Sequence, residues 1–257
     1  MILTAGVDNT NVVLGCFDGN RVCFTTRIAT DRKKTGIEYA ISIRSILELY
    51  AIPMQEISGS IFSCVVPALA LVMREALRLL FHREPLMVGP GVKSGISIVT
   101  ESISTVGGDL VAMAAAAVTE YAAPMILVDL DTATVMVAID ERKRFTGTVI
   151  APGAQISAQA LAQECDNLPQ VIMEAPREII GKNTSDSMRS GIIFGTAAMV
   201  DGMVERISEK LGGVNTIVAT GSLAGTIVPH CRSSMQVDDL LLLKGLKLIY
   251  DRNQHRS

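Results

Sequence analysis

The chain has no tryptophan and only three histidines and five cysteines in 257 residues. The histidines, His82, His230 and His255, have no metal-ligand spacing and form no Ser-His-Asp or Cys-His arrangement. Hydrolase chemistry through histidine is therefore disfavoured. The cysteines are odd in number and contain no C-x-x-C pair, which favours a reduced protein of the cytoplasm over a disulfide framework or a zinc site.

Long apolar runs and basic stretches are missing as well. The most apolar region, residues 110–130, is interrupted by Glu120 and Asp129, so no segment reaches the length of a membrane span. Lys and Arg total 23 against 26 Asp and Glu, and no basic stripe forms, so nucleic-acid and membrane partners are disfavoured. Hydrophobic residues make up 49% of the chain, enough for the core of one large domain or two ordinary ones.

Short β-branched runs alternate with helical patterns along the whole chain. The alternation predicts an α/β fold. Strands are predicted at residues 1–7, 11–17, 22–28, 57–67, 86–89 and 214–219, a strand pair at 125–140, and helices at 36–51, 68–82, 107–123, 154–165, 185–211 and 239–252.

The element at residues 125–140 resembles the N-terminal one. Placing Asp131 over Asp8, an offset of 131 − 8 = 123, matches Asn11 to Thr134. Each copy is an apolar strand, an acidic turn and a second apolar strand, which indicates a duplication. Chance similarity of two hairpins is the alternative. In a duplicated fold, two such turns facing a cleft would hold a nucleotide's phosphates with Thr or Asn side chains and backbone N–H groups.

Two glycine-containing stretches need separate interpretation. GPGVKS at residues 89–94 is not a P-loop, because Val92 precedes Lys93 where the motif needs glycine. ATGSLAG at 219–225 follows a predicted strand. It is either a turn that lets adenine or an anion approach the backbone, or an ordinary strand-to-helix turn.

Short motifs along the chain carry a family resemblance. They are NTN (9–11), SCVVP (63–67), GGDL (107–110), DLDTATV (129–135), GTVIAPG (147–153), LP (168–169), IGKNT (180–184), SGIIFG (190–195), TGSLA (220–224) and GLKLIYDRN (245–253). In this order they resemble the type III pantothenate kinases nearly end to end. The resemblance implies the actin-like ATPase fold, with ribonuclease-H-like halves at residues 1–115 and 116–238 and a last helix, 239–257, packing back on the first half.

The resemblance also implies an activity. Family members transfer the γ-phosphate of ATP to pantothenate, the first step of coenzyme A synthesis, using Mg²⁺ and a monovalent cation, K⁺ or NH₄⁺. They act as dimers in the cytoplasm, with the substrate pocket near the subunit interface. Asp109 matches the base that acts on the substrate hydroxyl; the alternative reading of Asp109 is a helix N-cap. The resemblance assigns nucleotide and phosphate binding to Asn9, Thr10, Asn11, Thr132, Thr134 and Gly221, and substrate binding to Gly107, Gly108 and Thr184. The predicted metal site is a carboxylate cluster of Asp8, Asp129 and Asp131, which would hold Mg²⁺ if Asp8 and Asp131 replace lost family ligands.

Several positions depart from the family motifs. The aspartate that opens the first hairpin motif is Gly6, and the glycines of the two turns are Asp8 and Asp131. The arginine used for the pantothenate carboxylate is Leu110, and a glycine of the last turn is Ser222. Carboxylates that face a triphosphate oppose its binding unless a cation lies between them.

The departures predict a poor or inactive pantothenate kinase when the chain acts alone. Three alternatives stay open. The chain is an active kinase with a rearranged metal site, in which Asp8 replaces the aspartate missing at position 6. It is a non-catalytic paralogue that acts as partner or regulatory subunit of an intact pantothenate kinase in a heterodimer. Or it is a kinase-fold enzyme for an acceptor without a carboxylate, which would suit Leu110.

Overall fold

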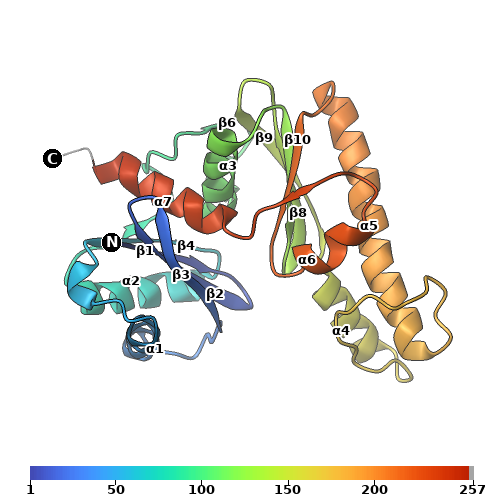
Figure 1. Ribbon diagram of the computed structural model, residues 1–257, viewed down its shortest axis with the longest axis horizontal. Coiled ribbons are helices and arrows are strands. Elements are labelled where there is room, and N and C mark those ends of the chain that lie inside the picture. Colours follow the sequence, from blue (N-terminus) through green and yellow to red (C-terminus); the bar gives the residue numbers. More distant parts are fainter. Residues whose placement is uncertain (255–257) are drawn as a thin grey trace. The chain divides into compact units, whose positions relative to one another are not determined.

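The computed structural model describes residues 1–254 in two compact units (Figure 1). Unit 1 contains residues 1–95, 102–116 and 241–254, and unit 2 contains residues 96–101 and 117–240. His255 and the rest of the predicted segment 239–257 after residue 254 lie outside the described residues. Within residues 1–254, no helix combines the length and apolar character needed to cross a membrane.

Unit 1 is built on a sheet of five strands in the order β3-β2-β1-β4-β5. The strands are β1 (Ile2–Val7), β2 (Asn11–Asp18), β3 (Arg21–Ala29), β4 (Gly59–Cys64) and β5 (Leu86–Met87). The first three are antiparallel neighbours, while β4 pairs in parallel with both β1 and β5. The turn between β1 and β2 therefore lies at the same edge of the sheet as the end of β4.

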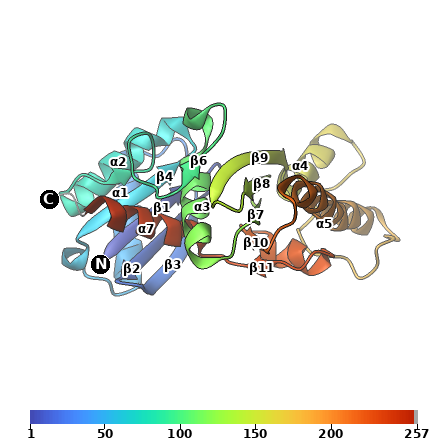
Figure 2. The same ribbon diagram turned by 90° about the horizontal axis from the view of Figure 1, so that it is seen from above.

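Helices cover both faces of this sheet. The helices α1 (Gly36–Leu49) and α2 (Pro67–Phe81) share a core with alternate residues of β1, because successive strand residues point to opposite faces. The helix α7 (Leu241–Gln254) packs on the other face against β1 and β4, as Figure 2 shows. The predicted strand 57–67 was too long, because Pro67 opens α2, and proline suits the first turn of a helix.

Unit 2 is built on a sheet of six strands in the order β11-β10-β7-β8-β9-β6. The strands are β6 (Ser97–Ile98), β7 (Met125–Leu130), β8 (Ala133–Ile139), β9 (Arg144–Pro152), β10 (Thr216–Thr220) and β11 (Gln236–Val237). Its helices are α4 (Ala154–Glu164), α5 (Thr184–Leu211) and α6 (Ala224–Ile227), and α3 (Gly108–Glu120) runs from unit 1 into unit 2. A 3₁₀ turn lies at Val228–His230 in unit 2, and two more lie in unit 1 at Met54–Glu56 and Ile103–Thr105. Residues of α4, α5 and α6 form one core with β7.

The strands β1, β2 and β3 of unit 1 correspond to β7, β8 and β9 of unit 2. Shifted by 123 residues, β1 coincides with β7 and β3 with β9. A β-bulge interrupts the pairing of the second and third strands in both units, at Cys16/Phe17 and at Ala138/Ile139. Chance similarity of two hairpins does not explain a shared bulge in a third strand, so we interpret the two units as copies.

The predicted match of Asn11 to Thr134 is wrong by one residue. Asn11 pairs with Ala29 in unit 1, and in unit 2 it is Ala133 that pairs with Pro152, the counterpart of Ala29. The physical reason is that the turn between β7 and β8 is one residue shorter than the turn between β1 and β2.

Candidate functional site

The turn after β1 is braced by the segment that follows β3. The backbone N–H of Asp8 donates to the carbonyl of Asn11 at 2.9 Å, and the Thr30 hydroxyl donates to the Asp8 carbonyl at 2.7 Å. Arg32 Nη2 donates to Asn9 Oδ1 at 2.9 Å. The structure thus fixes the backbone of the predicted phosphate-binding turn, and it holds a guanidinium beside that turn.

Gly6 lies at the end of β1, where the resemblance places an aspartate, and α7 occupies the space such a side chain would need. A Cβ atom on Gly6 would lie 2.5 Å from Cδ2 of Leu242, the second residue of α7. Carbon atoms pack at about 3.5–4.0 Å, so any side chain at position 6 requires Leu242 to move. Substitution of Gly6 alone therefore introduces a carboxylate here only together with a shift of the Leu242 side chain.

Ser63 on β4 is the register partner of Gly6. Its side chain is buried, and its hydroxyl oxygen has no hydrogen-bond partner among residues 1–254. That oxygen lies 3.9 Å from the Cβ position of Gly6. Buried hydroxyls are normally hydrogen-bonded, and a carboxylate at position 6 would supply the acceptor that Ser63 lacks.

Asp109 is the second residue of α3, within the first turn of the helix rather than at the cap. Burial raises the pKa of its carboxyl group, while hydrogen bonds from the backbone N–H groups of Leu110 and Asp109 itself lower it, and burial prevails. Its Oδ1 is buried and meets no hydrogen-bond partner within the described part of the chain. A Cβ atom on Gly107 would collide with this oxygen, so glycine at 107 makes room for the carboxylate. An acceptor held in this way suits a general base.

Asp109→Asn is expected to stabilise the fold at neutral pH. A carboxyl group whose pKa is higher in the folded state than in the unfolded state lowers the free energy of unfolding as the pH rises. The loss begins near the pKa of the unfolded state, about 3.9 for aspartate, and it is complete above the pKa of the folded state. Asparagine keeps the shape without the charge. Urea unfolding should give Asp109→Asn a higher midpoint than the parent chain at pH 7, with a smaller difference at pH 4.5.

Asp140→Asn is the matched control with the opposite sign. Although burial opposes it, the pKa of Asp140 is held low by hydrogen bonds from Arg144 and Arg142. Asp140→Asn should therefore lose stability at pH 7. Loss of stability in both variants at neutral pH would contradict the buried-charge account of Asp109.

The turn between β7 and β8 is enclosed by two other segments of unit 2. A Cβ atom on Gly153, which precedes α4, would collide with the carbonyl oxygens of Asp131 and Thr132. Gly221 has φ +99, and a Cβ there would lie 2.7 Å from Asp129 Oδ1. These glycines let three backbone segments approach one another around the predicted phosphate-binding turn.

Two of the departures from the family motifs meet in this place. The Ser222 hydroxyl donates to Asp131 Oδ1 at 2.9 Å. Both positions carry glycine in the family motifs, so the two replacements form one new hydrogen bond to a carboxylate. This hydrogen bond holds the Asp131 side chain against the turn that contains Ser222.

A double-mutant cycle measures this bond. Hydrogen bonds to charged groups stabilise folded proteins by about 1.5–3 kcal/mol, and solvent screening of this exposed pair reduces the expected coupling to about 0.5–1 kcal/mol. Asp131→Ala and Ser222→Ala should each lower the free energy of unfolding, and the double variant should lose less than the sum. Additive losses, within about 0.3 kcal/mol, would show that the bond is not formed.

The other predicted residues are divided between the units. Gly107, Gly108 and the turn Asp8–Asn11 belong to unit 1, whereas Asp129, Asp131, Thr132, Thr134, Thr184 and Gly221 belong to unit 2. Across residues 1–254, no group of three or more His, Cys, Asp or Glu side chains is placed to hold a metal ion. The assembly of Asp8 with Asp129 and Asp131 around Mg²⁺ stays a prediction.

Thr134 and Thr184, two of the predicted site residues in unit 2, lie in different surroundings. The hydroxyl of Thr134 is buried and has no partner in the described chain. Thr184 opens α5 and lines a largely apolar pocket of about 430 Å³ with Leu161 and Met188.

Sequence reasoning missed three residues of the candidate site: Ser63, Leu242 and Arg32. Ser63 lies in the SCVVP motif, so the motif could have directed attention to it. Leu242 contacts Gly6 from the far end of the chain, and Arg32 reaches Asn9 across 23 positions. Neither contact leaves a local pattern in the sequence.

Comparison with known proteins decides the family. A family model described as type III pantothenate kinase matches residues 2–206. A type III pantothenate kinase from an Exiguobacterium species is 41% identical over 254 residues, which cover 99% of this chain and 100% of that protein. One from Moorella thermoacetica is 39% identical over 253 residues, 98% of this chain and 100% of the relative. The chain belongs to the type III pantothenate kinase family.

Solved structures of distant proteins share the fold of this family member. A Baf family transcriptional activator from Campylobacter jejuni superposes with a TM-score of 0.59 at 15% identity, covering 98% of this chain and 99% of the other. The ROK hexokinase of Thermus thermophilus does so with a TM-score of 0.51 at 10% identity, covering 98% and 99%. These likenesses establish the fold alone. The predicted actin-like ATPase fold is confirmed.

Proposed function

We propose that this chain is a remodelled type III pantothenate kinase that, on its own, transfers phosphate from ATP to pantothenate weakly or not at all. The contact between Leu242 and the Cβ position of Gly6 carries the proposal. In the family motif this position holds the aspartate associated with Mg²⁺ and phosphate. A leucine methyl group neither binds a cation nor neutralises phosphate charge, and phosphoryl transfer depends on charge neutralisation.

The predicted binding site for the phosphoryl acceptor is altered in a different way. Asp109 has the burial and the raised pKa that suit a base acting on the substrate hydroxyl. Leu110, which follows it, offers no charge to a pantothenate carboxylate, and burying an unpaired carboxylate is costly. The chain therefore retains the predicted base, Asp109, but has lost the arginine predicted to bind the pantothenate carboxylate. Leu110 favours a variant reaction in which the phosphoryl acceptor has no carboxylate.

A coupled assay tests the proposal. The purified chain is supplied with ATP, Mg²⁺, K⁺ and pantothenate, and with pantothenol as the acceptor that lacks a carboxylate. Kinases commonly turn over at about 1–100 s⁻¹. We expect a pantothenate rate far below about 1 s⁻¹. Turnover at or above that rate would refute the proposal, and fast turnover of pantothenol alone would assign the chain to the other acceptor.

A partner role is the second candidate, favoured by the surface around the start of α5. Ile179 and Ile180, in the loop before the helix, are 70% and 77% exposed. The largely apolar pocket that contains Thr184 lies at the same helix start. Exposed apolar side chains beside an apolar pocket suit a protein interface. A homodimer, or a heterodimer with an intact pantothenate kinase of the cytoplasm, would cover them.

Co-expression with a family member that retains D-x-G-N-T and G-x-D-R tests the partner role. Co-purification in equal amounts is expected, together with higher pantothenate kinase activity than the intact member has alone. Charged substitutions at Ile179 and Ile180 should abolish both effects. If the two proteins elute separately and the activity is unchanged, the partner role is excluded.

A further inference from the structure

A cavity of about 370 Å³ lies where the loop before α5 meets the first turns of that helix. Its lining contains three cationic side chains, Arg177, Lys182 and Arg189, against two anionic ones, Glu178 and Asp186. The chain as a whole has a formal charge of −3, so a cavity with excess positive charge is a local feature. None of these residues takes part in the nucleotide, metal or substrate assignments above.

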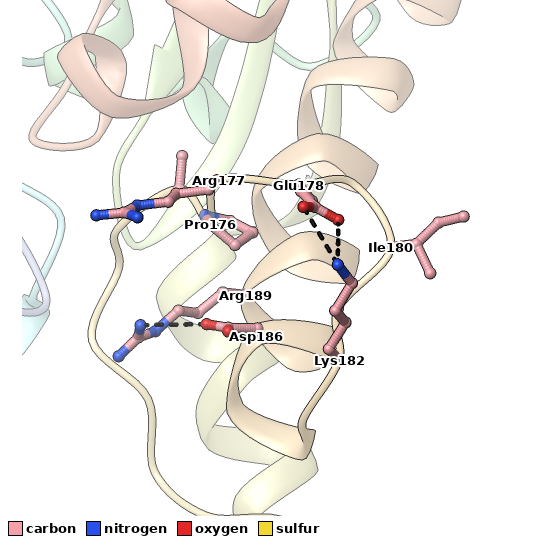
Figure 3. Close-up of a pocket in the computed structure, with 9 residues that line it drawn as sticks. Pro176, Arg177, Glu178, Ile180, Lys182, Asp186 and Arg189 are labelled. Carbon is pink, nitrogen blue, oxygen red and sulfur yellow. Dashed lines mark hydrogen bonds and ion pairs between the residues drawn. The ribbon is translucent and has the colours of Figure 1, made fainter.

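The charges in this cavity are arranged in two groups. Lys182 Nζ pairs with Glu178 Oε2 at 3.2 Å, and both side chains are exposed. Figure 3 shows the guanidinium groups of Arg177 and Arg189 directed to the same side, away from the Lys182–Glu178 pair. The cavity thus presents two arginines to one region and a neutralised pair to another.

Neither arginine has its hydrogen-bonding capacity filled. The side chain of Arg189 is 27% exposed, and its Nη1 lies 3.6 Å from Asp186 Oδ1, too long for a charge-assisted hydrogen bond. Its Nε is buried and finds no partner within the described part of the chain. The guanidinium of Arg177 makes no ion pair or hydrogen bond with any other described residue. Each guanidinium retains donors in the fixed fork geometry that matches phosphate and carboxylate oxygens.

The opposing carboxylate, Asp186, is itself engaged. It lies in the first turn of α5, where the helix dipole stabilises negative charge, and it accepts a hydrogen bond from Asn183 Nδ2 at 2.8 Å. It therefore orients Arg189 without closing a tight ion pair on it. Pro176 and Gly181 in the lining add no charge, and the volume is in the range of small-molecule pockets.

We propose that Arg177 and Arg189 form a binding site for the phosphate group of a small phosphorylated molecule, a function beyond the proposed kinase reaction. Phosphate is favoured over carboxylate because two guanidinium groups can share the oxygens and the double charge of a phosphate, whereas a single carboxylate offers two oxygens and one charge.

Calorimetric titration of the full chain with inorganic phosphate and with pyrophosphate tests the site. Single Arg177→Gln and Arg189→Gln variants should weaken binding about tenfold or more, in proportion to a lost charge-assisted contact. Lys182→Gln, in the same cavity but paired with Glu178, is the matched control and should change affinity less than about twofold. Unfolding curves identify any variant that is damaged as a whole.

Three results would overturn the proposal: no binding by the parent chain, equal binding by the Arg177→Gln/Arg189→Gln double variant, or acetate and succinate binding as tightly as the phosphates. The kinase assay separates this test from the preceding proposal. The double variant should leave pantothenate turnover, whatever its value, unchanged.

Discussion

The double variant Gly6→Asp/Leu242→Ala should bind ATP about 10- to 100-fold more tightly in Mg²⁺ than the parent chain. The expected gain corresponds to one charged contact, about 1.5–3 kcal/mol. Removing the Leu242 side chain beyond Cβ clears the position that now lies 2.5 Å from a Cβ at residue 6. The new carboxylate would also provide an acceptor for the Ser63 hydroxyl, which has no hydrogen-bond partner among residues 1–254. Calorimetry of ATP with Mg²⁺ measures the gain.

Three controls isolate the carboxylate. Gly6→Asp alone should be destabilised by overpacking, by about 1–3 kcal/mol, since Leu242 remains in place. Leu242→Ala alone should leave ATP affinity unchanged. Gly6→Asn/Leu242→Ala has nearly the shape of the designed pair without its charge. Equal gains in the Asn and Asp versions, or no gain in either, would mean that the missing charge at position 6 does not limit nucleotide binding.

Gly245→Ala should destabilise unit 1 by about 3 kcal/mol, the upper part of the range for overpacking. A Cβ atom on Gly245 in α7 would collide with the carbonyl oxygen of Ala112 in α3. Backbone atoms cannot rotate away as a side chain can, so α7 must shift as a unit. Because Leu242 is on the same helix, its contact with Gly6 should be disturbed too. Urea unfolding measures the loss.

Gly195→Ala is the matched control for this substitution. Gly195 lies inside α5, and a Cβ there meets no atom of another described segment within 4 Å. Alanine is the better helix former by about 0.8–1 kcal/mol, so a small gain in stability is expected. A loss below about 1 kcal/mol in Gly245→Ala would contradict the close packing of α7 on α3.

The sequence predicts most elements because their signals are local. Apolar spacing predicts α1 and α2, and the polar turn predicts the first hairpin. The strand β9 was not predicted, although residues 144–152 stand at the position of β3 in the repeat. Extending the 123-residue offset past the first hairpin would have found it. The short strands β6 and β11 pair over two residues each and have no pattern of their own.

The candidate site is less predictable than the fold. Asp109 and the two turns come from motifs, but the consequences of the departures depend on contacts between distant segments. The Ser222–Asp131 hydrogen bond spans 91 positions, and Leu242 is 236 residues from Gly6. The sequence indicates that residues at the predicted phosphate-binding positions differ from the family motifs. What now occupies these positions is visible only in the structure, in the packing of α7 on Gly6 and in the hydrogen bond between Ser222 and Asp131.

Calorimetric titration of ATP into the unmodified chain, with and without Mg²⁺, shows whether the two altered turns still bind the nucleotide together with the metal. An intact site of this family would gain affinity from the metal, because Mg²⁺ bridges protein carboxylates and phosphates. We expect Mg²⁺ to change the ATP dissociation constant by less than about threefold, under 1 kcal/mol. A tightening of about 100-fold that disappears in Asp8→Asn or Asp131→Asn would contradict it and establish a rearranged, working metal site.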